Sequence, residues 1–214
     1  MAYFVTGATG FIGQFLIRNL IKRRQPIYVL VRKGSVKKLE ALRAQWGATE
    51  KDVIPVVGDL GGRNLGVSPA DVKKLKGKID HMFHLAAVYD LKASADEQQK
   101  ANVDGTRHAL QFAKAVTAGC CHHVSSIAAA GLYDGVFRED MFDEAEELDH
   151  PYFRTKHDSE KVVRMECERP FRIYRPGFVV GDSKTGFIDK IDGPYYFFKF
   201  IQRLRKALPQ WMPT

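Results

Sequence analysis

Short apolar runs alternate with longer amphipathic stretches along most of the chain, and this alternation restricts its possible folds more than any other feature. The runs are rich in β-branched and aromatic residues and fall at 2–6, 27–31, 53–57, 79–85, 122–126 and 171–174. Helical patterns separate them at about 12–23, 35–46, 68–71, 98–117 and 152–167, with Ser35 expected as an N-cap. Strands that alternate with helices predict an α/β fold, a doubly wound parallel sheet of the Rossmann type.

Composition supports a folded, soluble chain. Of its 214 residues, 45% are hydrophobic and 27% are charged, which suits a globular domain with a substantial core. Three cysteines, two of them adjacent, do not form the framework of a disulfide-rich secreted domain, and the N-terminus lacks the pattern of an export signal. We therefore expect a cytoplasmic protein. Its excess of 33 basic over 25 acidic residues, a net charge of +8, predicts an anionic partner.

A glycine-rich segment follows the first predicted strand. Thr6-Gly7-Ala8-Thr9-Gly10-Phe11-Ile12-Gly13 lies where the pyrophosphate of a dinucleotide meets the N-terminus of a helix. Gly7 suits a tight turn, Gly10 allows the backbone to approach phosphates, and Gly13 allows close packing of helix and sheet. The spacing GxxGxxG is one residue wider than the usual fingerprint. The alternative is a turn that binds nothing.

The end of the second strand indicates which dinucleotide is preferred. An acidic residue there binds the ribose of NAD, whereas a basic residue accommodates the 2′-phosphate of NADP. The chain has Arg32 and Lys33 at this point, and an arginine can hold a phosphate through two parallel hydrogen bonds. We therefore expect NADPH, although a solvated surface arginine is the alternative. Asp59, after the third strand, is placed to meet the adenine or to serve in a turn.

Tyr152 and Lys156 lie four residues apart on one face of a predicted helix. A free tyrosine titrates near pH 10, and a fixed positive charge beside it favours the phenolate. Lys156 can supply that charge, which would make Tyr152 a general acid for carbonyl reduction. The alternative is an ordinary amphipathic helix, since this spacing is common by chance.

The fifth strand ends in two serines, at the edge where open α/β sheets bind ligands. A hydroxyl there can hold a substrate oxygen as negative charge develops on it. Neighbours on a strand face opposite sides, and Ser126 is favoured over Ser125. Asn102 either supports the cofactor ribose or a water, or is a structural amide inside a helix.

The motifs together resemble those of a known superfamily. TGATGFIG, HLAAVYD, ANVDGT, HVSSIAAAG, YxxxK and YRPG occur in the order and spacing of the extended short-chain dehydrogenases/reductases. Within it, HLAAVYD, the segment from REDMF to LDHPYFRTKHDSEKVV, and DGPYYFFKFIQ with LPQW resemble the N-terminal reductase region of bacterial fatty-alcohol-forming fatty acyl-CoA reductases. The resemblance covers essentially the whole chain. It implies NADPH-dependent reduction of a fatty acyl-CoA or fatty aldehyde toward the alcohol, in lipid metabolism.

The resemblance also implies site residues. Ser126, Tyr152 and Lys156 are the expected catalytic residues, and Pro176, Gly177 and Phe178 are expected beside the nicotinamide. The full set expected to bind the cofactor is Gly7, Thr9, Gly10, Phe11, Ile12, Gly13, Arg32, Asp59, Leu60, Leu85, Ala86, Ala87, Asn102, Tyr152, Lys156, Pro176, Gly177 and Phe178.

The family pattern departs from this chain at its C-terminal end, since extended members are longer. We expect residues 1–176 to form the NADP-binding Rossmann domain and 177–214 to begin a substrate-side region of a longer polypeptide. The expected partners are the acyl-CoA or aldehyde and the rest of that polypeptide. The sequence leaves open whether the protein forms an oligomer. An amphipathic helix at 195–211 is expected to line an acyl tunnel, to lie on a membrane surface as a peripheral contact, or to pack on the absent remainder.

Other functions stay open at this point. A nucleotide-sugar epimerase or hydroxysteroid-type dehydrogenase of the same superfamily would prefer NAD, which Arg32 disfavours. A non-catalytic regulatory protein that binds NADP would not need Ser126, Tyr152 and Lys156. No motif supports nucleic-acid binding. A metal site at 120–123 (Cys-Cys-His-His) is not expected, because alternate strand residues face opposite sides and at most two of the four converge.

Overall fold

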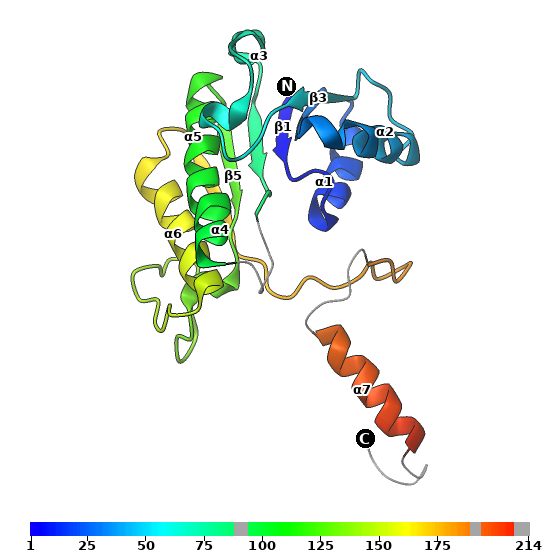
Figure 1. The fold of residues 1–214 in the computed structure, drawn as a ribbon, viewed down its shortest axis with the longest axis vertical. Helices are drawn as coiled ribbons and strands as arrows, with labels where there is room; N and C mark the ends of the chain where they lie inside the picture. The colour runs from blue at the N-terminus through cyan, green and yellow to red at the C-terminus, as the bar shows by residue number, and fades with distance from the viewer. Residues whose placement is uncertain (88–93, 189–193, 208–214) are drawn as a thin grey trace. The chain divides into compact units, whose positions relative to one another are not determined.

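A computed structural model of the chain describes residues 1–87, 94–188 and 194–207. They belong to two compact units, Met1–Pro176 and Gly177–Thr214, and each is described by itself. The first unit is built around a six-stranded sheet in the order β3-β2-β1-β4-β5-β6 (Figure 1). Every strand pairing is parallel. The predicted Rossmann-type sheet is therefore confirmed.

All six predicted strands are present, and their ends differ from the prediction by at most two residues. They are β1 (Tyr3–Thr6), β2 (Ile27–Val31), β3 (Val53–Val57), β4 (His81–His84), β5 (Cys120–Val124) and β6 (Phe171–Tyr174). In β1, Tyr3 is in register with Ile27 on one side and with His81 on the other. The strand order reverses at β1, and ligands of open α/β sheets bind beside the carboxyl ends of the strands at such a reversal.

The helices connect consecutive strands. The first unit contains α1 (Phe11–Ile21), α2 (Val36–Gln45), α3 (Pro69–Leu75), α4 (Ala95–Gln98), α5 (Gly105–Ala115) and α6 (Pro151–Glu166). Short turns of 3-10 helix lie at Lys33–Ser35, Arg63–Gly66 and Ile127–Ala130. Ser68 caps α3 as a helix-opening serine should, because its side chain accepts a hydrogen bond from Asp71 N.

Two helix predictions differ from the structure. Ser35 lies at the N-cap of α2 but makes no capping hydrogen bond, since a 3-10 turn places it at φ −101° and ψ 2°. The helix expected at 98–117 is three segments, α4, a π-helical turn at Gln99–Asp104, and α5. The hydroxyl of Thr106, in the first turn of α5, donates to Asn102 O within the π-helical turn at 2.6 Å, so a side chain competes for a helical carbonyl and the helix widens.

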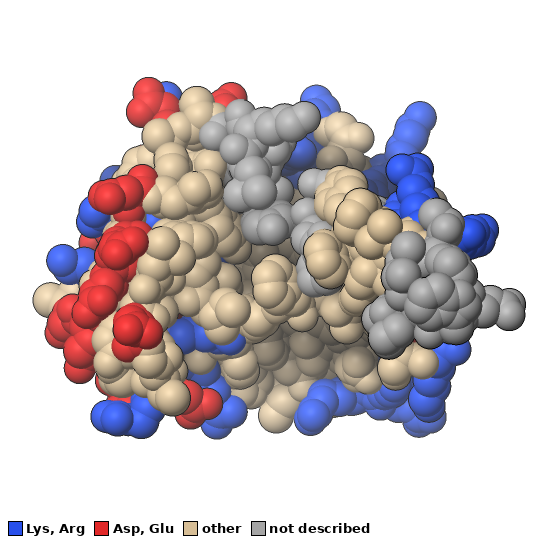
Figure 2. Space-filling model, turned by 90° about the horizontal axis from the view of Figure 1, so that it is seen from below, with Lys and Arg blue, Asp and Glu red and all other residues tan. Residues whose placement is uncertain are grey.

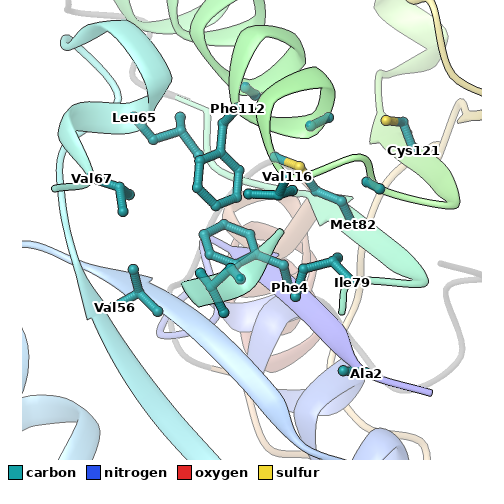
Figure 3. Packing of buried hydrophobic residues seen from close by; sticks show 14 residues of the cluster. Ala2, Phe4, Val56, Leu65, Val67, Ile79, Met82, Phe112, Val116 and Cys121 are labelled. Atoms are coloured by element: carbon teal, nitrogen blue, oxygen red, sulfur yellow. The ribbon is translucent and has the colours of Figure 1, made fainter. Parts of the chain in front are cut away.

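Alternate residues of β1 serve two separate cores. Phe4 points toward α5, where it packs against Phe112 with ring centroids 4.4 Å apart (Figure 3). Its neighbours Tyr3 and Val5 point to the opposite face, where they pack with Ile17 of α1 and with buried residues of α2 and β2. Both faces of β1 are thus covered, which leaves its carboxyl end as the part of the strand available to a ligand.

The segment 131–149 is irregular, with one isolated bridge between Gly131 and Glu146. It carries eight acidic residues and a single basic one, Arg138. Most of the acidic side chains are exposed. Figure 2 shows Asp and Glu side chains gathered along one side of the molecule, the side on which Figure 1 places α6.

The second unit contains α7 (Pro194–Ala207), and the part of the predicted helix beyond residue 207 lies outside the described residues. In this unit the hydroxyl of Tyr195 accepts a hydrogen bond from Gly181 N at 2.6 Å. Aromatic residues of α7 are largely exposed, Tyr196 at 65% and Phe197 at 63%. None of the helices in the described ranges has the length and apolar character needed to cross a bilayer.

Candidate active site and cofactor site

The glycine loop joins β1 to α1 in a tightly packed turn. Gly7 has φ +73°, a left-handed conformation that favours glycine, and a Cβ there would lie 2.7 Å from Ala86 N. A Cβ on Gly13 would overlap Gly7 O, so α1 can approach the loop only with glycine at this position. Gly10 N donates to Gly7 O at 3.1 Å, which closes the turn.

This loop fits a dinucleotide pyrophosphate. α1 begins at Phe11 without a side-chain cap and has no acidic residue in its first turn. Among the described atoms, a Cβ on Gly10 would have only Gly7 O within 4 Å, so the backbone is otherwise open there. Backbone N–H groups at a helix N-terminus attract anions, and nothing in this turn opposes them. Thr9 precedes α1, and Phe11 and Ile12 are its first residues; their contact with the cofactor stays a prediction.

A chain of buried hydrogen bonds links the glycine loop to the π-helical turn. Ala86 N donates to Thr6 Oγ1 at 3.2 Å, and Thr6 Oγ1 lies 2.8 Å from His84 Nδ1. On the other side of the ring, His84 Nε2 lies 3.2 Å from Thr106 Oγ1, whose proton goes to Asn102 O. Thr106 must therefore accept from His84 Nε2–H, and His84 Nδ1 accepts from Thr6.

His84 is neutral in this arrangement. Burial, and then the charge of Lys156, lower the pKa of His84 to about 3. The ring is 7% exposed. His84 thus packs at the end of β4, where its ring links β1 to the residues around the π-helical turn.

The residues expected around the adenosine lie at the ends of β2 and β3. Arg32 directly follows β2, is exposed, and has extended backbone angles of φ −69° and ψ 147°. Asp59 Oδ1 accepts from Gly61 N at 2.8 Å, and Asp59 N donates to Leu65 O at 2.7 Å, so the turn role considered for Asp59 is present. The carbonyl of Leu60 lies 2.7 Å from His108 Nδ1. Binding of adenine by Asp59 stays a prediction.

The two serines after β5 face different surroundings. Ser125 is 2% exposed and its hydroxyl donates to Glu160 Oε2 at 2.8 Å. Ser126 is half-buried, and its Oγ accepts a hydrogen bond from Ala128 N at 3.1 Å. That bond uses an oxygen lone pair and leaves the hydroxyl proton of Ser126 available to a substrate oxygen. The two hydroxyls therefore have different surroundings, and the catalytic role of Ser126 stays a prediction.

Tyr152 and Lys156 lie in the first turns of α6. His150 caps this helix, since its Nδ1 accepts from Tyr152 N at 3.1 Å. Tyr152 is half-buried, whereas Lys156 is 5% exposed. Lys156 Nζ donates to Val124 O at 3.3 Å, at the last residue of β5 and two residues before Ser126. The ion pairs found within the described residues do not include Lys156.

Burial lowers the pKa of Lys156 to about 8. The ammonium form still predominates at neutral pH, so a positive charge lies one helical turn from the Tyr152 phenol. Asn102 is held to the same helix, because its Nδ2 donates to Thr155 Oγ1 at 3.3 Å. Asn102 is 2% exposed, so it makes this contact inside the protein, and its support of the cofactor ribose stays a prediction.

The remaining predicted residues lie around the end of the sheet or in the second unit. Leu85, Ala86 and Ala87 follow β4 beside Gly7. Pro176 ends the first unit, and its carbonyl accepts from Ile127 N at 3.1 Å. Gly177 and Phe178 begin the second unit, where Phe178 is 75% exposed. Their expected place beside the nicotinamide stays a prediction.

Strand alternation also places the side chains of the Cys-Cys-His-His segment at 120–123 on opposite faces of the sheet in turn. The ligand atoms of Cys120 and His122 lie within 4.8 Å of one another and of a ring nitrogen of His81 on β4. His81 Nδ1 and His122 Nε2 are 2.9 Å apart, and His122 Nδ1 is 2.9 Å from the Tyr174 hydroxyl. Sequence reasoning did not include His81, because the neighbouring strand supplies it.

Two further residues near the site were not predicted from the sequence. Glu160 lies one turn after Lys156 on α6, and Arg175 lies in the YRPG motif. Glu160 accepts hydrogen bonds from Ser125 and Arg175. Arg175 also donates to two backbone carbonyls of the segment 131–149. The YRPG motif was the one sequence signal that pointed to Arg175. The contacts of Glu160 and Arg175 join residues that are far apart in the sequence, so the motif alone did not predict them.

Comparison with known proteins places the chain among reductases. The family model described as "Male sterility protein", an NAD-binding family, matches residues 5–214. A linear gramicidin synthase protein of Brevibacillus parabrevis is 34% identical over 207 residues, which are 89% of this chain and 4% of that protein. The putative fatty acyl-CoA reductase CG8306 of Drosophila melanogaster is 28% identical, over 91% of this chain and 47% of that protein.

A solved structure supports the same relationship. The terminal R domain from the myxalamid PKS-NRPS biosynthetic pathway superposes with a TM-score of 0.74 and 31% identity. The match covers 86% of this chain and 50% of that one. The chain therefore spans half or less of the length of each of these three proteins.

Proposed function

Because the chain belongs to the "Male sterility protein" family of NAD-binding domains, within the extended short-chain dehydrogenases/reductases, we propose that it is an NADPH-dependent carbonyl reductase domain. Its substrate is a fatty acyl-CoA or a fatty aldehyde, which it converts toward the alcohol. The observation that carries the proposal is the buried Lys156 ammonium, which lies one helical turn from Tyr152 and donates to Val124 O, two residues before Ser126.

The chain's own residues handle the proton and the developing charge. A bound nicotinamide cofactor would supply the hydride. Tyr152 gives its phenolic proton to the carbonyl oxygen, and the Lys156 charge makes the resulting phenolate easier to form. The Ser126 hydroxyl donates a hydrogen bond to the same oxygen as negative charge grows on it. The glycine loop and the N-terminus of α1 hold the pyrophosphate.

Preference for NADPH over NADH rests on the end of β2. Arg32 and Lys33 are exposed there, and no carboxylate takes the position that an NAD enzyme uses to bind ribose hydroxyls. A guanidinium can donate two parallel hydrogen bonds to a 2′-phosphate. The net charge of +8 supports the same assignment, since NADPH and coenzyme A thioesters both carry several phosphates.

The substrate class is supported by the relatives. One is named as a putative fatty acyl-CoA reductase, and another is a terminal R domain of an assembly line. Both names are compatible with reduction of an acyl group, and the motif resemblance favours the fatty acyl member. The relatives are at least twice as long as the matched part, so further residues of the polypeptide would complete the substrate pocket.

Oxidation of NADPH with decanal and with decanoyl-CoA tests the proposal. Binding of NADPH is measured separately by fluorescence, so that binding and turnover are distinguished. We expect oxidation with at least one of the two substrates, and a Tyr152→Phe variant that binds NADPH but turns over at least 100-fold more slowly, since general acid catalysis contributes about 10²–10⁴-fold. Tight NADPH binding with no oxidation of either carbonyl compound contradicts it.

A further inference from the structure

Glu160 is a fully buried carboxylate close to the proposed site. Its side chain is 0% exposed, and it lies on α6 one turn after Lys156. A carboxylate in such a place is strongly unfavourable unless charged and polar partners compensate for lost hydration. Any role for Glu160 must therefore be found in the groups that bind it.

Three side chains donate hydrogen bonds to the Glu160 carboxylate. Arg175 binds both oxygens, Nη2 to Oε1 at 2.6 Å and Nε to Oε2 at 3.1 Å. Arg164 Nη2 reaches Oε1 at 2.8 Å, and Ser125 Oγ reaches Oε2 at 2.8 Å. Burial acts to raise the pKa of Glu160, but these donors, Arg175 foremost, hold it below its usual value. Glu160 is thus ionised at neutral pH.

Arg175 extends this cluster to the acidic segment 131–149. Its Nη2 also donates to Met141 O at 2.7 Å, and its Nη1 donates to Arg138 O at 3.3 Å. The guanidinium lies 5.1 Å from the centre of the Phe137 ring, and that of Arg164 lies 4.6 Å from the centre of the Phe142 ring. Residues 137–142 are therefore fastened to α6 through the two arginines that Glu160 binds.

Ser125 extends the cluster in the other direction, to the proposed oxyanion donor. It is the residue before Ser126, and its hydroxyl is fixed by Glu160 Oε2. Arg175 precedes Pro176, whose carbonyl binds Ile127 N on the far side of Ser126. One carboxylate thus joins the helix that bears Tyr152 and Lys156, the strand end that bears Ser126, and the segment 137–142.

We propose that Glu160 is a positioning residue of the reductase site: it fixes Ser126 through Ser125 and closes residues 137–142 over α6 through Arg175. The inference rests on the proposed function and deepens it. Glu160 itself does not touch the substrate. A displacement of about 1 Å in a reacting group can cost roughly 100-fold in rate, so a remote residue that holds such groups matters to turnover.

Limited trypsin digestion tests the closure without any need for activity. Arg138 is the only basic residue in 131–149, so cleavage after it reports release of the segment. We expect Glu160→Gln to raise the cleavage rate about tenfold or more in protein shown to be folded by circular dichroism, because local opening controls proteolysis. Glu166→Gln is the matched control, since Glu166 lies on α6 but is exposed and pairs with Arg107.

If folded Glu160→Gln is cleaved after Arg138 at the same rate as wild type, the proposed closure of residues 137–142 over α6 is wrong. If Glu160→Gln does not fold, Arg175→Lys replaces it. A lysine keeps the charge but cannot bind the carboxylate and both carbonyls together, so the same acceleration is expected. Cleavage at the wild-type rate in Arg175→Lys then has the same meaning.

Ser125→Ala tests the connection to Ser126. It removes one hydroxyl and leaves the arginine contacts of Glu160 in place. We expect kcat for carbonyl reduction to fall roughly 10- to 100-fold, with the dissociation constant of NADPH and the cleavage rate at Arg138 unchanged. An unchanged kcat overturns this half of the proposal. If wild-type protein does not oxidise NADPH, the proposed function fails, and the digestion experiment still decides the closure.

Discussion

At the scale of single residues, Lys156 is a cation buried without an ion-pair partner among the described residues. Its ammonium is almost completely buried, and burial lowers its pKa from 10.5 to about 8. At pH values between about 8 and 10.5, Lys156 is protonated in the unfolded chain and largely deprotonated in the folded one. The contribution of Lys156 to stability therefore rises as pH rises through this range.

The pH dependence of stability reports this burial. At about 1.4 kcal/mol per pKa unit, the lowered pKa of Lys156 changes its contribution to the free energy of unfolding by about 3 kcal/mol. We expect the difference in unfolding free energy between wild type and Lys156→Met to shift by about 3 kcal/mol in favour of wild type across this pH window. Urea denaturation at both ends of the window measures it. Other titrating groups cancel in the difference, and a pH-independent difference would show that Lys156 is not buried as described.

Arg32 carries the expected choice of cofactor. We expect Arg32→Ala to weaken NADPH binding about 10- to 100-fold, because charge-assisted hydrogen bonds to a phosphate are lost, and to leave NADH binding unchanged. Fluorescence titration with both cofactors measures the effect. Lys33→Ala is the control, since it removes a neighbouring exposed cation without the bidentate group. Equal losses for NADPH and NADH would contradict a contact with the 2′-phosphate.

Sequence reasoning reached some of these residues and not others. Strand alternation separated Ser126 from Ser125, since that periodicity is local. Glu160 was missed because its partners, Ser125, Arg164 and Arg175, come together only when β5, α6 and the end of β6 pack. The burial of Lys156 was likewise invisible, because the helical pattern shows which face carries it and not how deeply that face is covered.

At the scale of elements, the loop from β1 to α1 leaves little room for side chains at its glycines. We expect Gly13→Ala to destabilise the protein by about 1–3 kcal/mol, because its Cβ would overlap Gly7 O and force the loop to move. NADPH binding should weaken with it. Thermal unfolding and cofactor titration measure the two effects.

Gly105→Ala is the matched control for this substitution. Its Cβ would lie an ordinary 3.5 Å from Leu60 Cβ. Since alanine favours a helix by up to about 1 kcal/mol over glycine, this variant should be neutral or more stable. Equal behaviour of the two variants would mean that the glycine loop is not tightly packed.

The first three strands were predicted well because each is a short, mainly apolar run between polar turns. The long helix was not, since the π-helical turn at Gln99–Asp104 depends on Thr106 and on His84 from another strand. A local signal did exist for its start: Ser94 and Glu97 form a capping box at α4. Helix ends set by side chains in the sequence are thus predictable, and widenings set by tertiary contacts are not.

At the scale of the whole molecule, the first unit brings the glycine loop, the end of β5 and the start of α6 to one edge of a parallel sheet. This follows from the topology, because parallel strands place all their carboxyl ends at the same edge. The expectation of an extended short-chain dehydrogenase/reductase is confirmed by the family match over residues 5–214. The relatives extend well beyond the matched region.

Transfer of deuterium from NADPH that carries deuterium at both C4 positions of its nicotinamide ring tests the central claim most directly. Mass spectrometry of the product formed from decanal is compared between wild type and Tyr152→Phe, each with bound cofactor confirmed by fluorescence. The account predicts decanol with one deuterium on the carbinol carbon from wild type, and at most one hundredth of that rate from the variant. Unlabelled product, or equal rates from the two proteins, would contradict it.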